Sequence, residues 1–478
     1  MKPTHLLTAA FAVSAALACA TPDSSQHAAS GADADRAAIV AAVDTVASAA
    51  DARDWPRVES TFAERVTLDY GTPEELAAAE VVRRWSALLP GFDATEHRLS
   101  GHDVKVQGDT AEVTSRFVAV HRITGAPGGD TWTLEGTYAH RLVRTPTGWR
   151  VSAMRMSPGG STGNLALLEL AKERAAGVRV QVRTVRFQSH GETLVGHLYL
   201  PPGDTGTRRL PALVVTGSWT TVKEQMAGRY ARRLAAEGFA TLAFDFRGYG
   251  ESGGTPRGFE SPARKVQDIR SALTFLEGLP EVDGRRLGAV GVCASAGYEA
   301  QAAAEDPRIR SLVLVAPWLH DEELVKSIYG GEEGVRSRMQ QGREARLAFE
   351  RTGEVRHVPT ISTTDKDAAM FGEWDYYLNP ARGAVPQWDT RFAVMSWEAW
   401  LSFAPTKLGP RIRVPTLMVH SRDAALPQGL ERFAASLAGP QELVWLQGTQ
   451  FDFYDGEAQV QRSIAEAARH LRATLPPG

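Results

Sequence analysis

Cysteine is the scarcest residue type in this 478-residue chain, which contains two, Cys19 and Cys293. Two cysteines allow one disulfide at most, so the fold must be held together by its hydrophobic core rather than by a disulfide framework. The chain also lacks an excess of charge, because 53 Lys and Arg against 56 Asp and Glu leave a net charge of −3. With no basic stripe for nucleic acid, we expect small molecules as partners.

Long apolar runs are lacking after the first twenty residues, so no later segment is predicted to span a bilayer. Residues 1–18 have the pattern of a secretory signal, because Lys2 precedes an apolar, Ala-rich run. We therefore expect an exported protein, either periplasmic, attached to the envelope or secreted. Cys19 closes a sequence that resembles the lipid-attachment box of bacterial lipoproteins, which implies membrane attachment through a lipid, although Ala16 stands where that box prefers Leu. Ordinary cleavage nearby is the alternative, and residues 19–34 are predicted to be a flexible tether.

The length of the chain predicts two domains, and the first of them covers residues 35–157. Apolar residues recur at helical spacing from Asp35, and residues 57–62 and 74–89 continue such patterns, which predicts three helices. After Pro90 the pattern changes to alternation, which predicts strands over 96–107, 110–122, 131–144 and 149–156. Helices followed by a strand meander are typical of an α+β domain.

Several motifs in this region resemble the SnoaL-like cone, a curved sheet wrapped over helices around a pocket. They are Asp54-Trp55, Val66–Gly71, His97 and Gly108–Ala111. The scytalone-dehydratase-like members of that superfamily use an Asp, a Tyr and two His, and the resemblance implies these roles for the matching residues. The matching residues are Asp51, Tyr70, His97 and His121, while Ala50 replaces a second Tyr.

The implied chemistry of the cone is proton transfer next to a carbonyl group, with a His–Asp pair moving the proton while Tyr polarises the oxygen. The alternative is that these four polar residues line a ligand pocket or a homodimer contact. His102 and His140 are expected to be surface or strand residues.

Residues 158–177 begin with Pro158–Gly163, a clear linker signal, and residues 178–478 form the second domain. In this domain strands alternate with helices, which predicts a mostly parallel, doubly wound sheet. Residues from about 318 to 410 interrupt the alternation and are dense in aromatic side chains, which predicts an inserted cap. Such a cap would cover a pocket for an apolar or aromatic acyl group.

The second domain is organised around Leu287–Tyr298, where an apolar strand pattern breaks into small residues before a helix. This pattern predicts a nucleophile elbow, a sharp turn that exposes one side chain and leaves the next backbone N–H free for an oxyanion. Two frames fit the pattern, one with Cys293 and one with Ser295 as the nucleophile. We favour Cys293, because it falls where the strand ends, whereas Ser295 falls in the first helical turn. A buried, inert cysteine is the alternative.

The remaining catalytic groups are predicted from their places relative to the strands. Asp423 follows a late buried strand, which is where this fold carries the triad acid. The amides of Ser218, Trp219 and Ala294 are the candidate oxyanion donors. Gln450 stands where the triad histidine is expected, and a Gln side chain cannot carry a proton near neutral pH. His320, beside the cap, is the candidate for a relocated base.

Four stretches of the second domain resemble the dienelactone-hydrolase-related branch of the bacterial α/β-hydrolases. They are Lys223–Met226, the Cys293–Ser295 elbow, Val394–Trp397 and Phe451–Asp455. The resemblance implies a hydrolase acting on an ester, lactone or thioester, or an acyl transferase. The alternative is a catalytically silent binding protein with a hydrolase fold. No metal or other cofactor is predicted.

Overall fold

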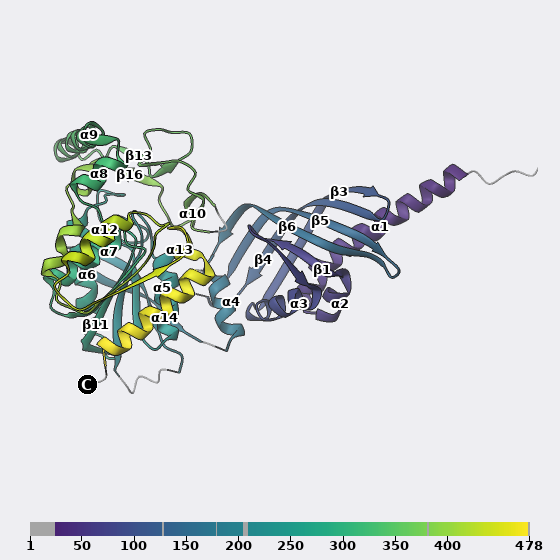
Figure 1. The fold of residues 1–478 in the computed structure, drawn as a ribbon, viewed down its shortest axis with the longest axis horizontal. Helices are drawn as coiled ribbons and strands as arrows, with labels where there is room; N and C mark the ends of the chain where they lie inside the picture. The colour runs from purple at the N-terminus through teal and green to yellow at the C-terminus, as the bar shows by residue number, and fades with distance from the viewer. Residues whose placement is uncertain (1–23, 127–128, 178, 204–208, 380–381, 477–478) are drawn as a thin grey trace, which may run out of the picture.

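The computed structural model describes residues 24–126, 129–177, 179–203, 209–379 and 382–476, so the predicted signal segment and Cys19 lie outside it. The described chain forms two bodies joined near helix α4 (Figure 1). Among the described residues, none of the helices combines the length and the apolar character needed to cross a membrane.

The first body is a curved six-stranded sheet packed over helices, as the sequence predicts for a SnoaL-like cone (Figure 1). Its strand order is β2-β1-β6-β5-β4-β3, with β1 and β6 parallel and the other pairs antiparallel. The strands are β1 (Phe62–Asp69), β2 (Pro73–Ala77), β3 (Ala94–Gln107), β4 (Thr110–Arg122), β5 (Thr131–Thr145) and β6 (Gly148–Gly163). The helices are α1 (Ser24–Asp51), α2 (Trp55–Thr61), α3 (Ala78–Ser86) and the 3-10 turn η1 (Leu89–Gly91).

Three boundaries in this body differ from the sequence predictions. The described part of the expected tether belongs to α1, which starts at Ser24. The helix expected over 74–89 opens as strand β2, because Pro73–Ala77 completes the sheet edge beside β1. The expected linker motif Pro158–Gly163 belongs to β6, where it pairs with β5 as far as the Trp132–Gly163 pair. Glycines remain compatible with a strand at its edges and irregularities, so this Gly-rich motif is part of a strand rather than a loop.

The second body is an eight-stranded sheet in the order β18-β17-β12-β11-β9-β10-β8-β7. Strand β8 runs antiparallel to both of its neighbours, β7 and β10, and the six strands from β18 to β10 in this order run parallel to one another. This arrangement confirms the predicted fold class. The strands are β7 (Gln181–Ser189), β8 (Glu192–Leu200), β9 (Leu210–Thr216), β10 (Ala240–Phe244), β11 (Val282–Val292), β12 (Ile309–Val315), β17 (Thr416–Ser421) and β18 (Gln441–Leu446). The central strands are fully buried, as expected when helices cover both faces of a parallel sheet.

The helices of this body are α5 (Met226–Ala236), α6 (Pro262–Glu277), α7 (Ser295–Glu305), α12 (Pro427–Ser436), α13 (Asp452–Asp455) and α14 (Glu457–Thr474). The cap lies between β12 and β17, at the top of this body in Figure 1. It comprises α8 (Glu322–Ile328), α9 (Gly331–Thr352), β13 (His357–Pro359), β14 (Ile361–Ser362), β15 (Met370–Phe371), α10 (Asp375–Leu378), β16 (Arg391–Ala393), α11 (Ser396–Leu401) and η2 (Pro405–Arg411).

Helix α4 (Leu167–Ala175) connects the two bodies through an ion-pair network. Glu169 of α4 pairs with Arg229 and Arg233 of α5, both at 3.0 Å. Arg233 also pairs with Glu457, at 2.7 Å. The surrounding cations hold the pKa of Glu169 at about 2 against the opposing effect of burial, so Glu169 is ionised across the physiological range.

Candidate active sites

Cys293 occupies a sharp turn between strand β11 and helix α7. Its φ of 58° lies in the left-handed region, which residues with a Cβ rarely adopt, so the surrounding fold must hold it there. Its N–H donates to the Val315 carbonyl at 3.0 Å, and its carbonyl accepts from the Trp318 N–H at 2.9 Å. Gly291 makes room for the turn, because a Cβ there would lie 2.7 Å from the Ser295 carbonyl oxygen.

The thiol of Cys293 is closed off from solvent, with 4% of the residue exposed. Burial raises the pKa of the thiol, and hydrogen bonds from Ser218, Tyr454, the Ala294 amide and Gln450 offset part of that rise. The thiol is therefore protonated at neutral pH and is surrounded by groups that can stabilise a thiolate once one forms.

Gln450 contacts the thiol but is fixed by three other hydrogen bonds. Its side-chain oxygen accepts from the Ala425 N–H at 3.0 Å, and its nitrogen donates to the Ala316 carbonyl at 2.8 Å and to the Tyr454 hydroxyl at 3.3 Å. The Gln oxygen needs an N–H donor on this side, which a backbone amide supplies and a carboxylate does not.

The predicted acid, Asp423, is not brought to Gln450. Its side chain is exposed, and within the described chain no hydrogen bond joins it to Gln450. The loop after β17 reaches Gln450 through the Ala425 amide instead. The structure therefore contains an elbow without an acid–base relay behind it.

The two other candidates at this site lie in packed surroundings. Ser295 is the first residue of α7, and its buried hydroxyl has no hydrogen-bond partner among the described residues. His320 is fully buried against Trp400, with 4.5 Å between ring centroids, and its Nε2 lies 3.2 Å from the Trp400 carbonyl. Burial lowers the pKa of His320 to about 4, so the ring is neutral and fixed to the cap rather than to Cys293.

The predicted oxyanion donors lie on the loop after β9 and at the start of α7. The Ser218 N–H points at the Met226 sulfur, 3.4 Å away, which is a weak acceptor that a carbonyl oxygen can replace. Among the described residues, the Trp219 N–H has no hydrogen-bond acceptor. The Ala294 amide hydrogen-bonds the Cys293 thiol itself.

The aromatic residues of the cap are packed directly onto this loop. Trp219 lies 4.8 Å from Phe392, 5.3 Å from Trp400 and 5.9 Å from Trp397, measured between ring centroids. The Tyr377 hydroxyl is 2.8 Å from the Ser218 hydroxyl. The cap rings therefore cover the loop that carries Ser218 and Trp219.

A second candidate site lies in the cone, where His97 and Asp51 form a dyad. His97 Nδ1 lies 2.7 Å from Asp51 Oδ1, and the other carboxylate oxygen accepts from the His97 N–H at 2.6 Å. Burial raises the pKa of Asp51, but the hydrogen bonds and charge of His97, with a hydrogen bond from Thr95, outweigh it and place the pKa below its usual value. An ionised Asp51 fixes the proton on Nδ1, which leaves Nε2 of His97 as a base.

His97 of this dyad lines a cavity of about 580 Å³ together with His121 and Tyr70, whereas Asp51 is not among the residues that line it. His121 stacks on Trp132, with ring centroids 4.5 Å apart, and burial followed by the nearby His97 lowers its pKa to about 4. Tyr70 is 48% exposed, so its ring is open to both cavity and solvent.

Tyr138 and His140 also line the cavity, and we did not predict them. His140, expected to be a surface or strand residue, is 2% exposed on β5. Both share the buried face of β5 with Trp132, at even spacing along the strand. Strict alternation from Trp132 was the signal that could have placed them inside the cone.

Comparison with known proteins matches both bodies of the chain. Residues 33–155 match the SnoaL-like domain, and residues 212–460 match the alpha/beta hydrolase family. The uncharacterized protein PA2218 of Pseudomonas aeruginosa is 33% identical over 62% of this chain and 82% of its own length. Its crystal structure superimposes with a TM-score of 0.55, covering 62% of this chain and 94% of that chain.

Two fungal relatives carry functional names. The acyltransferase drtE of Aspergillus calidoustus is 35% identical over 30% of this chain and 45% of its own length. The thiohydrolase aneE of Aspergillus aculeatus is 33% identical over 36% of this chain and 51% of its own length.

Proposed function

Because this chain belongs to the alpha/beta hydrolase family, we propose that it is an acyl-transfer enzyme with Cys293 as its nucleophile. The observation that carries the proposal is the left-handed backbone of Cys293 at the junction of β11 and α7. A strained, non-glycine residue at this junction is the arrangement by which the fold presents its nucleophile. The names of the two fungal relatives support the same class of chemistry.

The reaction begins when the thiol sulfur attacks the carbonyl carbon of an ester, lactone or thioester. The oxygen of the tetrahedral intermediate accepts hydrogen bonds from the Ala294 and Trp219 amides. The intermediate collapses, the leaving group departs with the proton of the thiol, and a Cys293 thioester remains. An alcohol, a thiol or water then attacks this thioester and takes the acyl group. The proton that the attacking molecule loses returns to the sulfur of Cys293.

The surroundings of the thiol favour thioester substrates and acyl transfer over hydrolysis. Water needs a general base to attack an acyl-enzyme, and Gln450 cannot accept the proton. A thiol leaving group resembles Cys293 in acidity, so exchange between two thioesters needs less help from a base. The aromatic cap on Trp219 suits a bulky apolar or aromatic acyl group.

The test is to incubate the full chain with an aromatic acyl thioester and to detect the acyl-enzyme by intact-mass measurement. We expect one acyl group per chain on Cys293, faster release to an added thiol than to water, and no adduct in Cys293→Ala. Ser295→Ala is the matched control, because it removes the alternative nucleophile of the same elbow. This variant should keep the adduct. An adduct that persists in Cys293→Ala would overturn the proposal.

Gln450→His tests the missing base separately. An imidazole beside the thiol should raise hydrolysis of the acyl-enzyme by about 100-fold or more, since about 100-fold is the lower end of the range of general-base catalysis, while transfer to a thiol changes less. If neither variant nor parent forms an adduct, and iodoacetamide leaves Cys293 unmodified, the domain is a binding scaffold.

A second candidate function belongs to the cone, and the His97–Asp51 dyad favours it, since His97 lines the cavity of about 580 Å³. We propose that the cone binds a carbonyl compound, which the dyad dehydrates or isomerises. Asp51→Asn and His97→Gln should abolish turnover in an enzyme and only weaken affinity in a carrier. His102→Gln is the matched control, since His102 pairs with Asp44 at 3.0 Å and does not line the cavity.

We also propose that the chain is exported, on the basis of the amino-terminal sequence pattern. Mass spectrometry of envelope-fraction protein should find either a lipidated Cys19 or a free amino terminus close to it. Recovery of intact Met1 from the cytosol would contradict export.

A further inference from the structure

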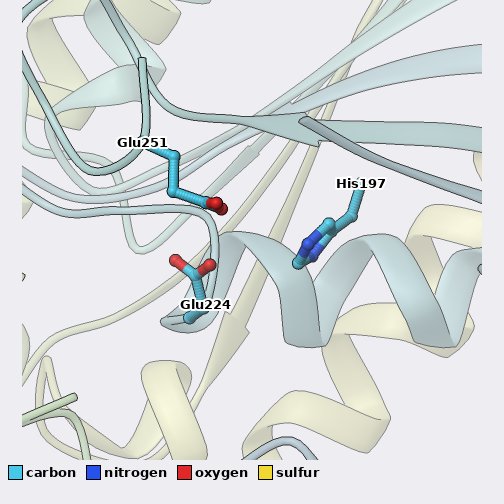
Figure 2. Close-up of side chains that lie close together, drawn as sticks. All are labelled: His197, Glu224 and Glu251. Carbon is cyan, nitrogen blue, oxygen red and sulfur yellow. The ribbon is translucent and has the colours of Figure 1, made fainter. Parts of the chain in front are cut away.

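Three side chains that neither proposed reaction uses converge beside strand β8 (Figure 2). His197 comes from β8, Glu224 from the loop before α5, and Glu251 from the loop after β10. One potential ligand atom from each lies within 4.8 Å of the others. In Figure 2 the imidazole and both carboxylates point toward the same space.

His197 is the least explained member of this cluster. It is 9% exposed, and its ring forms no hydrogen bond to any residue that the structure describes. Its ring nitrogens are therefore free of hydrogen-bond partners among the described residues, and an imidazole nitrogen is a common ligand of transition-metal ions.

The charge of the cluster is only partly balanced. The Lys223 ammonium pairs with Glu224 Oε1 at 2.7 Å, Asp245 Oδ2 at 2.8 Å and Glu251 Oε2 at 2.6 Å. One ammonium against three carboxylates leaves two negative charges.

Lys223 leaves one oxygen of the Glu224 carboxylate unused. Glu224 Oε2 is buried and has no hydrogen-bond partner among the described residues. His197 and Glu224 also border a small cavity of about 90 Å³, which is large enough for an ion and its water. A tetrahedral ion with ligands at about 2.1 Å separates them by about 3.4 Å, so the three side chains need small rotamer shifts to bind it.

We propose that His197, Glu224 and Glu251 form a site for a divalent transition-metal ion of the zinc type. One imidazole and two carboxylates match the ligands of Zn²⁺, and water completes the coordination. Two positive charges neutralise the cluster while Lys223 stays in place, because each carboxylate can bridge the ammonium and the ion through different oxygens. The ion would fix the loop of Ser218–Gln225, which carries the oxyanion amides, to strand β8.

The test is to titrate Zn²⁺ into the full chain after dialysis against a chelator, using calorimetry and bound-metal analysis. We expect one equivalent of Zn²⁺ per chain, a higher melting temperature with Zn²⁺, and weaker binding of Mg²⁺, which prefers oxygen ligands. Removing one ligand in His197→Gln or Glu224→Gln should weaken Zn²⁺ binding by at least about tenfold. His190→Gln, on the nearby exposed β7–β8 turn, is the matched control and should bind as the parent does.

Circular dichroism of the metal-free variants identifies any that fail to fold. In that case Glu251→Gln provides the test, because the side chain of Glu251 is 50% exposed and tolerates replacement. Absence of a saturable Zn²⁺ site in the parent would overturn the proposal. Unchanged Zn²⁺ affinity in folded His197→Gln, Glu224→Gln or Glu251→Gln would also overturn it, because the ion would then be bound elsewhere.

Discussion

Glu299 should make the stability of this protein fall as the pH rises, which is unusual for a carboxylic acid. Glu299 lies on α7 behind the elbow and is fully buried. Its Oε1 accepts from the Thr216 hydroxyl at 2.7 Å, and its Oε2 has no partner among the described residues. Burial raises its pKa to about 8, against the smaller opposing effect of the Thr216 hydrogen bond.

The size and sign of the effect follow from linkage. In the unfolded chain the carboxyl loses its proton near pH 4.5, whereas in the folded protein it keeps the proton until about pH 8. Between these values unfolding releases a proton, so raising the pH favours unfolding. At about 1.4 kcal/mol for each pH unit of that window, the contribution of Glu299 to the free energy of unfolding should fall by up to about 5 kcal/mol from pH 4.5 to pH 8.

The assay is urea denaturation of the parent and Glu299→Gln at pH 5, 7 and 9. Glutamine keeps an acceptor for Thr216 and removes the titration, so the difference in unfolding free energy between variant and parent should grow with pH. Glu305→Gln, at an exposed position on the same helix, is the matched control and should run parallel to the parent. Parallel curves for Glu299→Gln as well would refute the argument, because Glu299 would then have a normal pKa in the folded state.

Three further predictions concern buried residues of the two domains. Gly291→Ala should destabilise the fold by about 3 kcal/mol or more in urea titrations, because its Cβ meets backbone atoms, whereas Gly288→Ala meets mainly the movable Leu213 and Leu475 side chains and should cost less. Lys265→Met should cost about 3–5 kcal/mol by the same measurement, because it leaves the fully buried Glu260 without its ion pair, 2.7 Å long in the parent. Burial lowers the pKa values of five histidines to about 4, so these side chains stay neutral in the folded protein. The free energy of unfolding, followed by circular dichroism, should therefore fall as the pH drops from about 6.5 to 4. A free energy of unfolding that does not change over this range would contradict the prediction. The five histidines are His121, His140, His197, His320 and His420.

The order and type of the sheet elements could be predicted because their signal is local. Strand β4 has the predicted bounds, Thr110–Arg122, and the elbow appears where an apolar run meets Gly291 and Ala294. Small residues at such a turn are required by sterics, as the 2.7 Å approach at Gly291 demonstrates. Features fixed by short-range sterics and by burial on both faces are therefore readable from the chain.

Features that depend on which loops meet in space could not be predicted. The sequence placed Asp423 beside Gln450, but the loop turns so that the Ala425 amide makes the contact. The sequence pattern does not determine which of two residues, two positions apart in a loop, makes a contact. His197, Glu224 and Glu251 are likewise far apart in sequence and come together only through the pairing of β8 with β10 and the loops that follow.

Helix α4 lies within residues 158–177, which the sequence predicts to be a linker. Leu168 lines the cavity of the cone, while the next residue, Glu169, pairs with Arg229 and Arg233 of the second domain. Adjacent helical residues point about 100° apart, so one short helix can present an apolar side chain to one domain and a carboxylate to the other. The Gly-rich motif before it is absorbed into β6, and the boundary is a packed helix held by buried ion pairs. Glu169 is 9% exposed, so removal of its arginine partners would leave a buried charge unpaired. Because separation of the two bodies would break these ion pairs, the contact fixes their relative orientation more firmly than a flexible tether does.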